Sequence, residues 1–326
     1  NDNIRINGKD LGCKVIGEGA NLGCTQLGRV EFCSFGGRTN TDAIDNSAGV
    51  DASDHEVNIK ILLSSAVNTG KLAMKQRNTL LSSMTNEVGE LVLVHNYLQS
   101  QAISQIQYLG ANQLEKQQRL MKKLEREHLL NREVEFLPND DTIYERRSLK
   151  QGLYRPEIST LLSYSKNWLF KELIASNIPN DKFLEKILIE YFPSALRKKF
   201  ESEIKNHRLR RQIIATRVSN TLIDRTGDTF IQATMEKTGF APAEITRAFI
   251  IAVEIFALTD LWKKIEHLDN FVPSATQIMM RKDINVLIDW IVLWLLKNGT
   301  DKLDLSKNTL EFKDGIKTLS SELQKV

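Results

Sequence analysis

Cysteine is scarce in this 326-residue sequence: only Cys13, Cys24 and Cys33 occur, and no two of them form a Cys-x-x-Cys pair. An odd number of thiols without that spacing excludes a disulfide framework and a cysteine-based zinc site, and indicates reduced thiols in a cytoplasmic protein. A membrane span is also missing. The longest apolar stretch, residues 286–296, has about half of the roughly 20 residues required, and Asp289 interrupts it. We therefore expect a cytoplasmic protein that contacts no membrane.

Histidine is rare as well, with five residues in the whole chain. His55 and Glu56 begin a pattern typical of zinc proteases, but Ile59 stands where such a helix needs its second histidine. The pattern therefore fails, and we expect no metal.

Neither sign of charge dominates the sequence. Lys and Arg total 44 and Asp and Glu total 41, which gives a net charge of +3 and no argument for a nucleic-acid surface. The basic run 207–211 could contact phosphates, but Glu201 and Glu203 interrupt the basic residues near it, which favours a solvated or intersubunit face. We expect no nucleic-acid partner. The alternative would show itself as an affinity that falls steeply with salt.

Proline is missing from the first 137 residues, whereas nine of the 17 glycines lie within the first 50. Glycines among short apolar runs indicate tight turns and close backbone approaches. Residues 13–16 and 38–44 are strand candidates, and residues 25–35 fit neither the helical nor the strand period. Two strands cannot close a normal sheet, so we predict the final part of an α/β domain. Because the sequence also begins at Asn1 without methionine, we expect a piece of a longer chain.

From Ser53 onward the pattern is helical. Ser53 and Glu56 have the spacing of a capping box, and apolar residues then recur every three or four positions. We predict an all-helical domain that includes helices at 156–176, 181–204, 207–225, 229–238, 242–257 and 274–297. Four tryptophans fall at apolar helical positions and are expected in its core: Trp168, Trp262, Trp290 and Trp294.

The segment Gly17–Gly23 is the first candidate site. It is similar to a phosphate-binding glycine loop, but its third glycine is displaced by one position from G-x-G-x-x-G. We therefore favour a glycine-lined turn with Asn21 in a cleft, where its amide could bind a ribose hydroxyl or a carboxamide. Alternatively, Asn21 is only a turn residue that tolerates an unusual backbone angle.

The second candidate is the run of small and polar residues from Thr41 to Glu56, which we expect to enter a helix at or near Ser53. Free N–H groups and the positive end of the helix dipole would favour a carboxylate or phosphate there, and the Ser53 hydroxyl could add a hydrogen bond. In the other interpretation Ser53 only caps the helix, and Asp51 and Asp54 complement its dipole.

Residues 15–25 (VIGEGANLGCT) followed by residues 46–53 (NSAGVDAS) resemble glutamate dehydrogenases, in particular the large, multidomain NAD-specific bacterial class. The likeness continues at residues 76–78, 124–127, 135–138, 155–157 and 208–211, so it covers most of the chain. It implies that residues 1–70 are the C-terminal part of a Rossmann-like catalytic and dinucleotide-binding domain. Residues 71–326 would then be a helical C-terminal domain.

The resemblance implies oxidative deamination of L-glutamate to 2-oxoglutarate and ammonia, with hydride transfer to NAD. Asn21 matches a family asparagine that contacts the cofactor, and Asn46 matches one beside the nicotinamide and its ribose. Ser53 matches the serine that binds the side-chain carboxylate of the substrate, and Val50 a residue of the pocket wall. The backbone details of both turns stay open, because Leu22-Gly23-Cys24 and Ser47-Ala48-Gly49 depart from the family pattern.

No part of the sequence matches the catalytic lysine and aspartate of the family, which we expect before residue 1. We therefore predict no catalytic residue in this chain and no turnover by the chain alone, and we expect the complete protein to be a homo-oligomer. A second hypothesis is a non-catalytic helical module for interaction or regulation.

Overall fold

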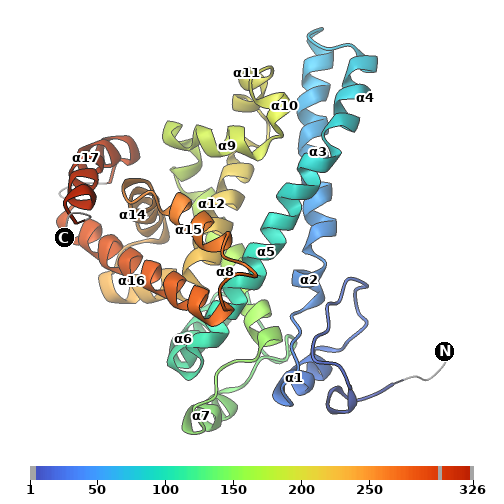
Figure 1. Cartoon of the computed structure of the whole chain (residues 1–326), viewed down its shortest axis with the longest axis vertical. Helices are drawn as coiled ribbons and strands as arrows, with labels where there is room; N and C mark the ends of the chain where they lie inside the picture. Colours follow the sequence, from blue (N-terminus) through green and yellow to red (C-terminus); the bar gives the residue numbers. More distant parts are fainter. Residues whose placement is uncertain (1–4, 300–302, 324–326) are drawn as a thin grey trace.

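The structure is a computed structural model that describes residues 5–299 and 303–323. Seventeen α-helices are found in these two ranges (Figure 1). They are α1 Gln26–Ser34, α2 Asp42–Asp45, α3 Ser47–Asn68, α4 Met74–Ser83, α5 Thr85–Leu109, α6 Ala111–Arg126, α7 Asp140–Ser148, α8 Arg155–Ala175, α9 Glu185–Tyr191, α10 Ser194–Arg197, α11 Glu201–Lys205, α12 Arg210–Thr226, α13 Phe230–Thr238, α14 Pro242–Ile255, α15 Leu258–Glu266, α16 Ser274–Asn298 and α17 Leu305–Leu323. None of the described helices is long and apolar enough to cross a bilayer.

The predicted α/β remnant is wrong, since the described residues contain no strand. The two strand candidates meet in a single parallel bridge between Val15 and Arg38. Two hydrogen bonds make this bridge, from Ile16 N to Arg38 O at 3.0 Å and from Arg38 N to Lys14 O at 2.9 Å. A pair this short cannot form a sheet, and Val15 is 66% exposed with no layer packed over it. No Rossmann-like remnant is visible in the described chain.

Local hydrogen bonds explain why the neighbouring segments become helical. The Thr25 hydroxyl accepts a hydrogen bond from Gly28 N at 3.0 Å and so caps α1, which resolves the ambiguous stretch 25–35 as a helix. Thr41 precedes α2 in an extended conformation, so the second strand candidate ends in a helical turn instead of continuing. Both segments therefore satisfy their backbone groups within the chain, without a neighbouring strand.

The prediction that the remainder is helical is confirmed. The helices predicted at 156–176, 229–238, 242–257 and 274–297 correspond closely to α8, α13, α14 and α16. The stretch 181–204 is instead divided into η3 (Lys182–Leu184), α9, α10 and α11, because Pro193 cannot continue a helix. Helix α15 was not predicted; it follows Ala257, which has a left-handed φ of 49°.

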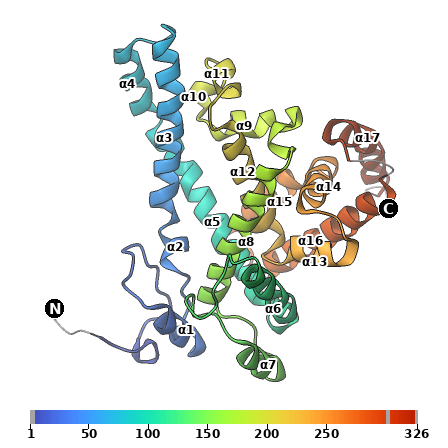
Figure 2. The same ribbon diagram turned by 180° about the vertical axis from the view of Figure 1, so that it is seen from behind.

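The core lies where α5, α8 and α12 pack against one another in the middle of the molecule, as Figure 2 shows from behind. Helices α14, α16 and α17 pack together at one side of it, and α3 packs along α5 at the other. Trp168 and Trp262 are each only 3% exposed and belong to this core, as expected. The same expectation is wrong for Trp290 and Trp294, which are 72% and 49% exposed on α16.

Helix α3 is held in place by a buried polar and aromatic network on one of its sides. The His55 ring is 1% exposed and stacks on Tyr191 of α9, with ring centroids 4.4 Å apart. Asp51 accepts a hydrogen bond from His95 Nδ1 of α5 at 2.6 Å, and the other ring nitrogen of His95 contacts the half-buried Arg217 guanidinium of α12. These contacts tie α3 to three other helices and so fix its rotation about its own axis.

Burial lowers the pKa of His55, and interactions with His95 and the Arg217 guanidinium lower it further, whereas Asp51 and Asp54 oppose them. The fold therefore favours the neutral imidazole. This contribution to stability is complete above the unfolded-state pKa of about 6.5 and is lost as the pH falls below that value.

We predict that the free energy of unfolding falls from pH 6.5 to pH 5, and that His55→Phe makes this fall smaller because it removes the titrating ring but keeps the stack on Tyr191. Urea denaturation at several pH values measures the effect.

The buried His207, whose pKa is also lowered by burial, accounts for part of the fall that remains in His55→Phe. The exposed His267, replaced by glutamine, is the matched control. An equal acid loss in wild type and His55→Phe would contradict the prediction.

Candidate functional site

The glycine-rich segment Gly17–Gly23 forms a turn that is closed by its own acidic residue. The Glu18 carboxylate accepts hydrogen bonds from the backbone N–H groups of Gly23 and Cys24, the second at 3.2 Å. Its other oxygen binds Arg29 of α1, whose Nε lies 3.1 Å away, and both side chains are buried. Backbone N–H groups that a phosphate would need are therefore already bound to Glu18, and the turn is not a phosphate cradle.

Asn21 lies at the exposed tip of this turn. Its φ of 57° and the φ of 59° at Leu22 are both in the left-handed region, which asparagine tolerates and leucine rarely adopts. Leu22 N donates a hydrogen bond to Asp42 at 3.4 Å, which supports the strained residue. The interpretation of Asn21 as a turn residue with an unusual backbone angle is therefore correct, but its side chain also has a partner.

That partner is Asn46, which stands between α2 and α3. Asn46 Nδ2 donates a hydrogen bond to Asn21 Oδ1 at 2.9 Å. The Asn46 side chain does not cap α3, so its amide is available for this contact. The pair leaves the Asn21 amide donors and the Asn46 amide oxygen without a further partner in the described residues. Donors beside an acceptor at an exposed position suit a ribose hydroxyl or a carboxamide.

A chain of hydrogen bonds connects the amide pair to the helical body. Asp45 accepts from Glu18 N at 3.0 Å and from Asn40 Nδ2 at 2.8 Å. Asn40 Oδ1 in turn accepts from Arg155 Nε of α8 at 3.1 Å. On the other side Asn96 of α5 donates to Ile44 O at 2.8 Å. Burial lowers the pKa of Arg155 to about 10, so this guanidinium remains charged at neutral pH.

Sequence reasoning missed these supporting residues. Glu18 lies within a motif whose interpretation depended on its glycines and on Asn21, and Arg155 lies within a segment that carried the resemblance without an assigned role. The signal that could have found them is a charged residue within an otherwise small or apolar segment, since buried charges are normally paired.

Val50 and Ser53 lie on α3, four and seven residues after Asn46, which places all three residues on one face of the helix. Val50 is 77% exposed and Ser53 is also exposed. The expected helix start at Ser53 is wrong, because α3 begins at Ser47. The Ser53 N–H is therefore used within the helix, and only its hydroxyl is available to an anion.

Asp51, His55 and His95 form a group whose potential metal-binding atoms lie within 4.8 Å of one another. The arrangement does not favour a cation, because the positively charged, half-buried Arg217 already contacts the His95 ring. We interpret the group as the network that fixes α3.

Two residues of the basic run 207–211 are used within the fold, whereas Arg208 is exposed. Arg211 donates hydrogen bonds to Ile174 O at 2.7 Å and to Ser176 O at 3.2 Å, at the C-terminal end of α8. His207 is buried, and its Nε2 lies 3.2 Å from Asn58 O. The positive charge of Arg211 at the C-terminal end of α8 complements the dipole of that helix.

Comparison with known proteins supports the resemblance to glutamate dehydrogenases. A family model described as "Bacterial NAD-glutamate dehydrogenase, catalytic domain" matches residues 1–106, and one described as "Glutamate dehydrogenase, C-terminal" matches residues 150–326. The first includes all four candidate site residues, Asn21, Asn46, Val50 and Ser53.

Three curated relatives are each named NAD-specific glutamate dehydrogenase. The protein of Halomonas elongata is 45% identical over 300 residues, which are 92% of this chain and 19% of the relative. The proteins of Pseudomonas aeruginosa and Mycobacterium tuberculosis are 42% and 39% identical over 100% and 99% of this chain, and over 20% of each relative. The chain therefore spans about a fifth of the length of these relatives. Because the C-terminal family model covers more than half of the chain, as the resemblance predicted, this chain belongs to the glutamate dehydrogenase family.

Proposed function

We propose that this chain is part of an NAD-dependent glutamate dehydrogenase, which oxidises L-glutamate to 2-oxoglutarate and ammonia. The observation that carries the proposal is the 2.9 Å hydrogen bond between Asn46 and Asn21. It brings together two amides that lie 25 residues apart in the sequence and that match the two cofactor-contacting positions of the family. Their free donors and acceptor suit the carboxamide and ribose of the nicotinamide half of NAD.

The substrate would lie along α3, beyond the amide pair. A helix rises about 1.5 Å per residue, so Ser53 lies about 10 Å along α3 from Asn46. In this arrangement the Ser53 hydroxyl donates a hydrogen bond to the side-chain carboxylate of glutamate, and Val50 covers the apolar chain between the two ends. The buried network around His55 keeps this face of α3 turned toward the ligands.

The helical body would act as a brace for the site. Arg155 of α8 and Asn96 of α5 support this role, because both contact the segment that leads into α3. The division of the chain after residue 70 also remains our proposal, and Gly70, with a φ of 73°, stands at the end of α3. We further propose a cytoplasmic location, which the three free cysteines support, and a homo-oligomer in the complete protein.

We predict that the 326-residue chain alone does not reduce NAD when glutamate is added. Hydride transfer needs a general acid–base beside the reacting carbon, and no part of the sequence matches the catalytic lysine and aspartate of the family. The absorbance of NADH measures the reaction, with a complete enzyme that contains this chain as the positive control. Steady turnover by the chain alone would contradict the prediction.

In the complete enzyme, Ser53→Ala should raise the KM for glutamate about tenfold or more. A hydrogen bond to a charged group contributes about 1.5–3 kcal/mol. The KM for NAD should not change. Ser64→Ala is a matched control, because Ser64 is an exposed serine on the same face of α3, about three turns further along. If the two variants had the same KM for glutamate, Ser53 would not be a substrate-binding residue.

Asn21→Ala and Asn46→Ala should each raise the KM for NAD, and their effects should not add. Because the two amides are hydrogen-bonded to each other, either substitution disturbs both, and the double variant should lose less than the sum of the single losses. A double-mutant cycle on KM and on the free energy of unfolding measures this coupling. Full additivity in both quantities would exclude a shared site.

A further inference from the structure

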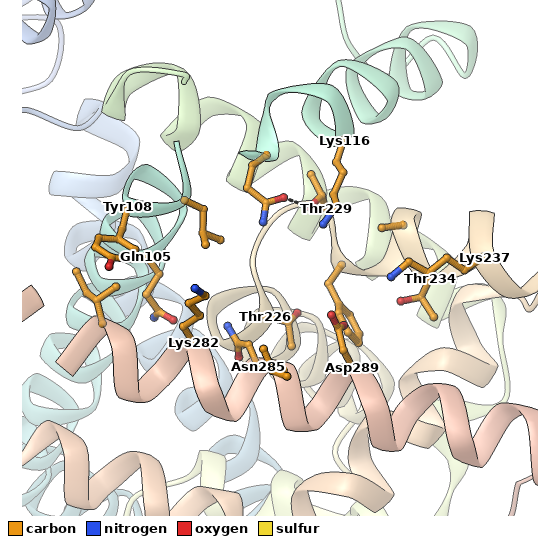
Figure 3. Close-up of a pocket in the computed structure, with 16 residues that line it drawn as sticks. Gln105, Tyr108, Lys116, Thr226, Thr229, Thr234, Lys237, Lys282, Asn285 and Asp289 are labelled. Carbon is orange, nitrogen blue, oxygen red and sulfur yellow. Dashed lines mark hydrogen bonds between the residues drawn. The ribbon is translucent and has the colours of Figure 1, made fainter. Parts of the chain in front are cut away.

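A hollow of about 170 Å³ lies between α5, α6, α13 and α16, and none of its lining residues belongs to the candidate site described above. Figure 3 shows three lysine side chains that reach into it from three different helices. They are Lys116 of α6, Lys237 of α13 and Lys282 of α16. Because the three lysines are distant in sequence, the tertiary fold is what brings their charges together.

The charge in this hollow is not balanced. Asp289 is the one carboxylate among the lining residues, and the buried Asp228, next to the lining residue Thr229, also interacts with the charge of Lys116. Three lysine charges therefore outnumber the two carboxylates near them. Within residues 5–299 and 303–323, no ion pair joins Lys116, Lys237 or Lys282 to a carboxylate. Burial raises the pKa of Asp289, and Lys237 and Lys116 act in the opposite direction. Lys237 and Lys282 are exposed and Lys116 is half-buried, so solvent screens the repulsion among them, and an anion held between the three would be attracted by each.

One polar side chain of the hollow also has an unsatisfied hydrogen-bond acceptor. Asn285 Oδ1 is buried and has no hydrogen-bond partner, although most buried polar atoms have one. Figure 3 shows Asn285 beside Thr226, with Gln105 and Lys282 nearby. A ligand with a hydroxyl or amine donor would satisfy the Asn285 oxygen. This orphan atom is a second sign, independent of the charge, that the hollow is a binding site.

Size and lining restrict the ligand. The volume of about 170 Å³ is below the 300–1,000 Å³ typical of pockets for drug-sized molecules, so the ligand is small. Phe230, Ala233, Ile278 and Val286 provide an apolar wall. Three ammonium groups at the hollow can pair with the charges of a ligand that carries two negative charges.

We propose that this hollow binds a small organic dianion, either a phosphate monoester or a dicarboxylate, through Lys116, Lys237 and Lys282. The lysine ammonium groups hold the two charges. The donor of the ligand points to Asn285, and its carbon skeleton lies on Phe230. The site does not depend on the proposed dehydrogenase activity, because it uses neither the amide pair nor the face of α3.

Isothermal titration of the purified protein tests the proposal, with inorganic phosphate and succinate as the two probes and acetate as a singly charged control at constant ionic strength. We expect at least one of the two dianions to bind more tightly than acetate. The double variant Lys237→Gln/Lys282→Gln should weaken this binding at least about tenfold, since two charge-assisted contacts are lost. Asp289→Asn should tighten it severalfold, because it removes the opposing charge.

The matched control is Lys263→Gln/Lys264→Gln, which removes the same charge from two exposed lysines of α15 outside the hollow. It should leave the affinity for the dianion within about twofold of wild type. Tighter binding of phosphate would identify the ligand as a phosphate monoester, and tighter binding of succinate would identify it as a dicarboxylate. Absence of binding by both probes would overturn the proposal, and so would equal losses in the two double variants.

Discussion

The buried guanidinium of Arg155 is the constraint on which the arrangement of the candidate site depends. It binds Asn40 through Nε, and its Nη1 donates to Ser104 and Gln107 of α5 at 3.0 and 3.2 Å. It therefore joins the start of α8, the C-terminal end of α5 and the segment that leads into α3. In a sheet, backbone ladders would hold such a segment. Here side-chain hydrogen bonds hold it, so the loss of one charged residue would leave several buried polar groups unpaired.

The start of α8 explains why Arg155 can act in this way. Pro156 has a fixed φ that suits the first turn, and Glu157 accepts a hydrogen bond from Tyr154 N at 2.7 Å. Arg146 of α7 binds the same carboxylate with two hydrogen bonds, at 2.6 and 2.9 Å. The helix therefore begins at a defined residue and aims Arg155 at the loop segment. This gives the resemblance at residues 155–157 a structural meaning.

Periodicity predicted most helices correctly, because their apolar residues face a shared core. It failed where local pattern and tertiary context differ. The exposed tryptophans of α16 were expected in the core because this helix carries apolar residues on all of its sides. Such a pattern does not reveal which side packs against the rest of the protein. Ser53 has the spacing of a cap but lies in the second turn of α3. The strand candidates had the right composition, but a strand also needs a partner along its length, which sequence spacing cannot supply.

The candidate site was predictable only in part, for a related reason. Asn21 was singled out by its place in the glycine-rich turn and Asn46 by a resemblance. The hydrogen bond between them depends on the Glu18–Arg29 pair and on Asp45, which hold the turn against α1 and the end of α2. Such pairs have no period and cannot be read from spacing. The two sides of α3 have separate tasks. One side is buried against Tyr191 and His95, with Arg217 behind His95. The other side carries Asn46, Val50 and Ser53, to which we assign the ligands, and its Val50 and Ser53 are exposed. A helix turns about 100° with each residue, so the buried side sets the direction in which the open side faces.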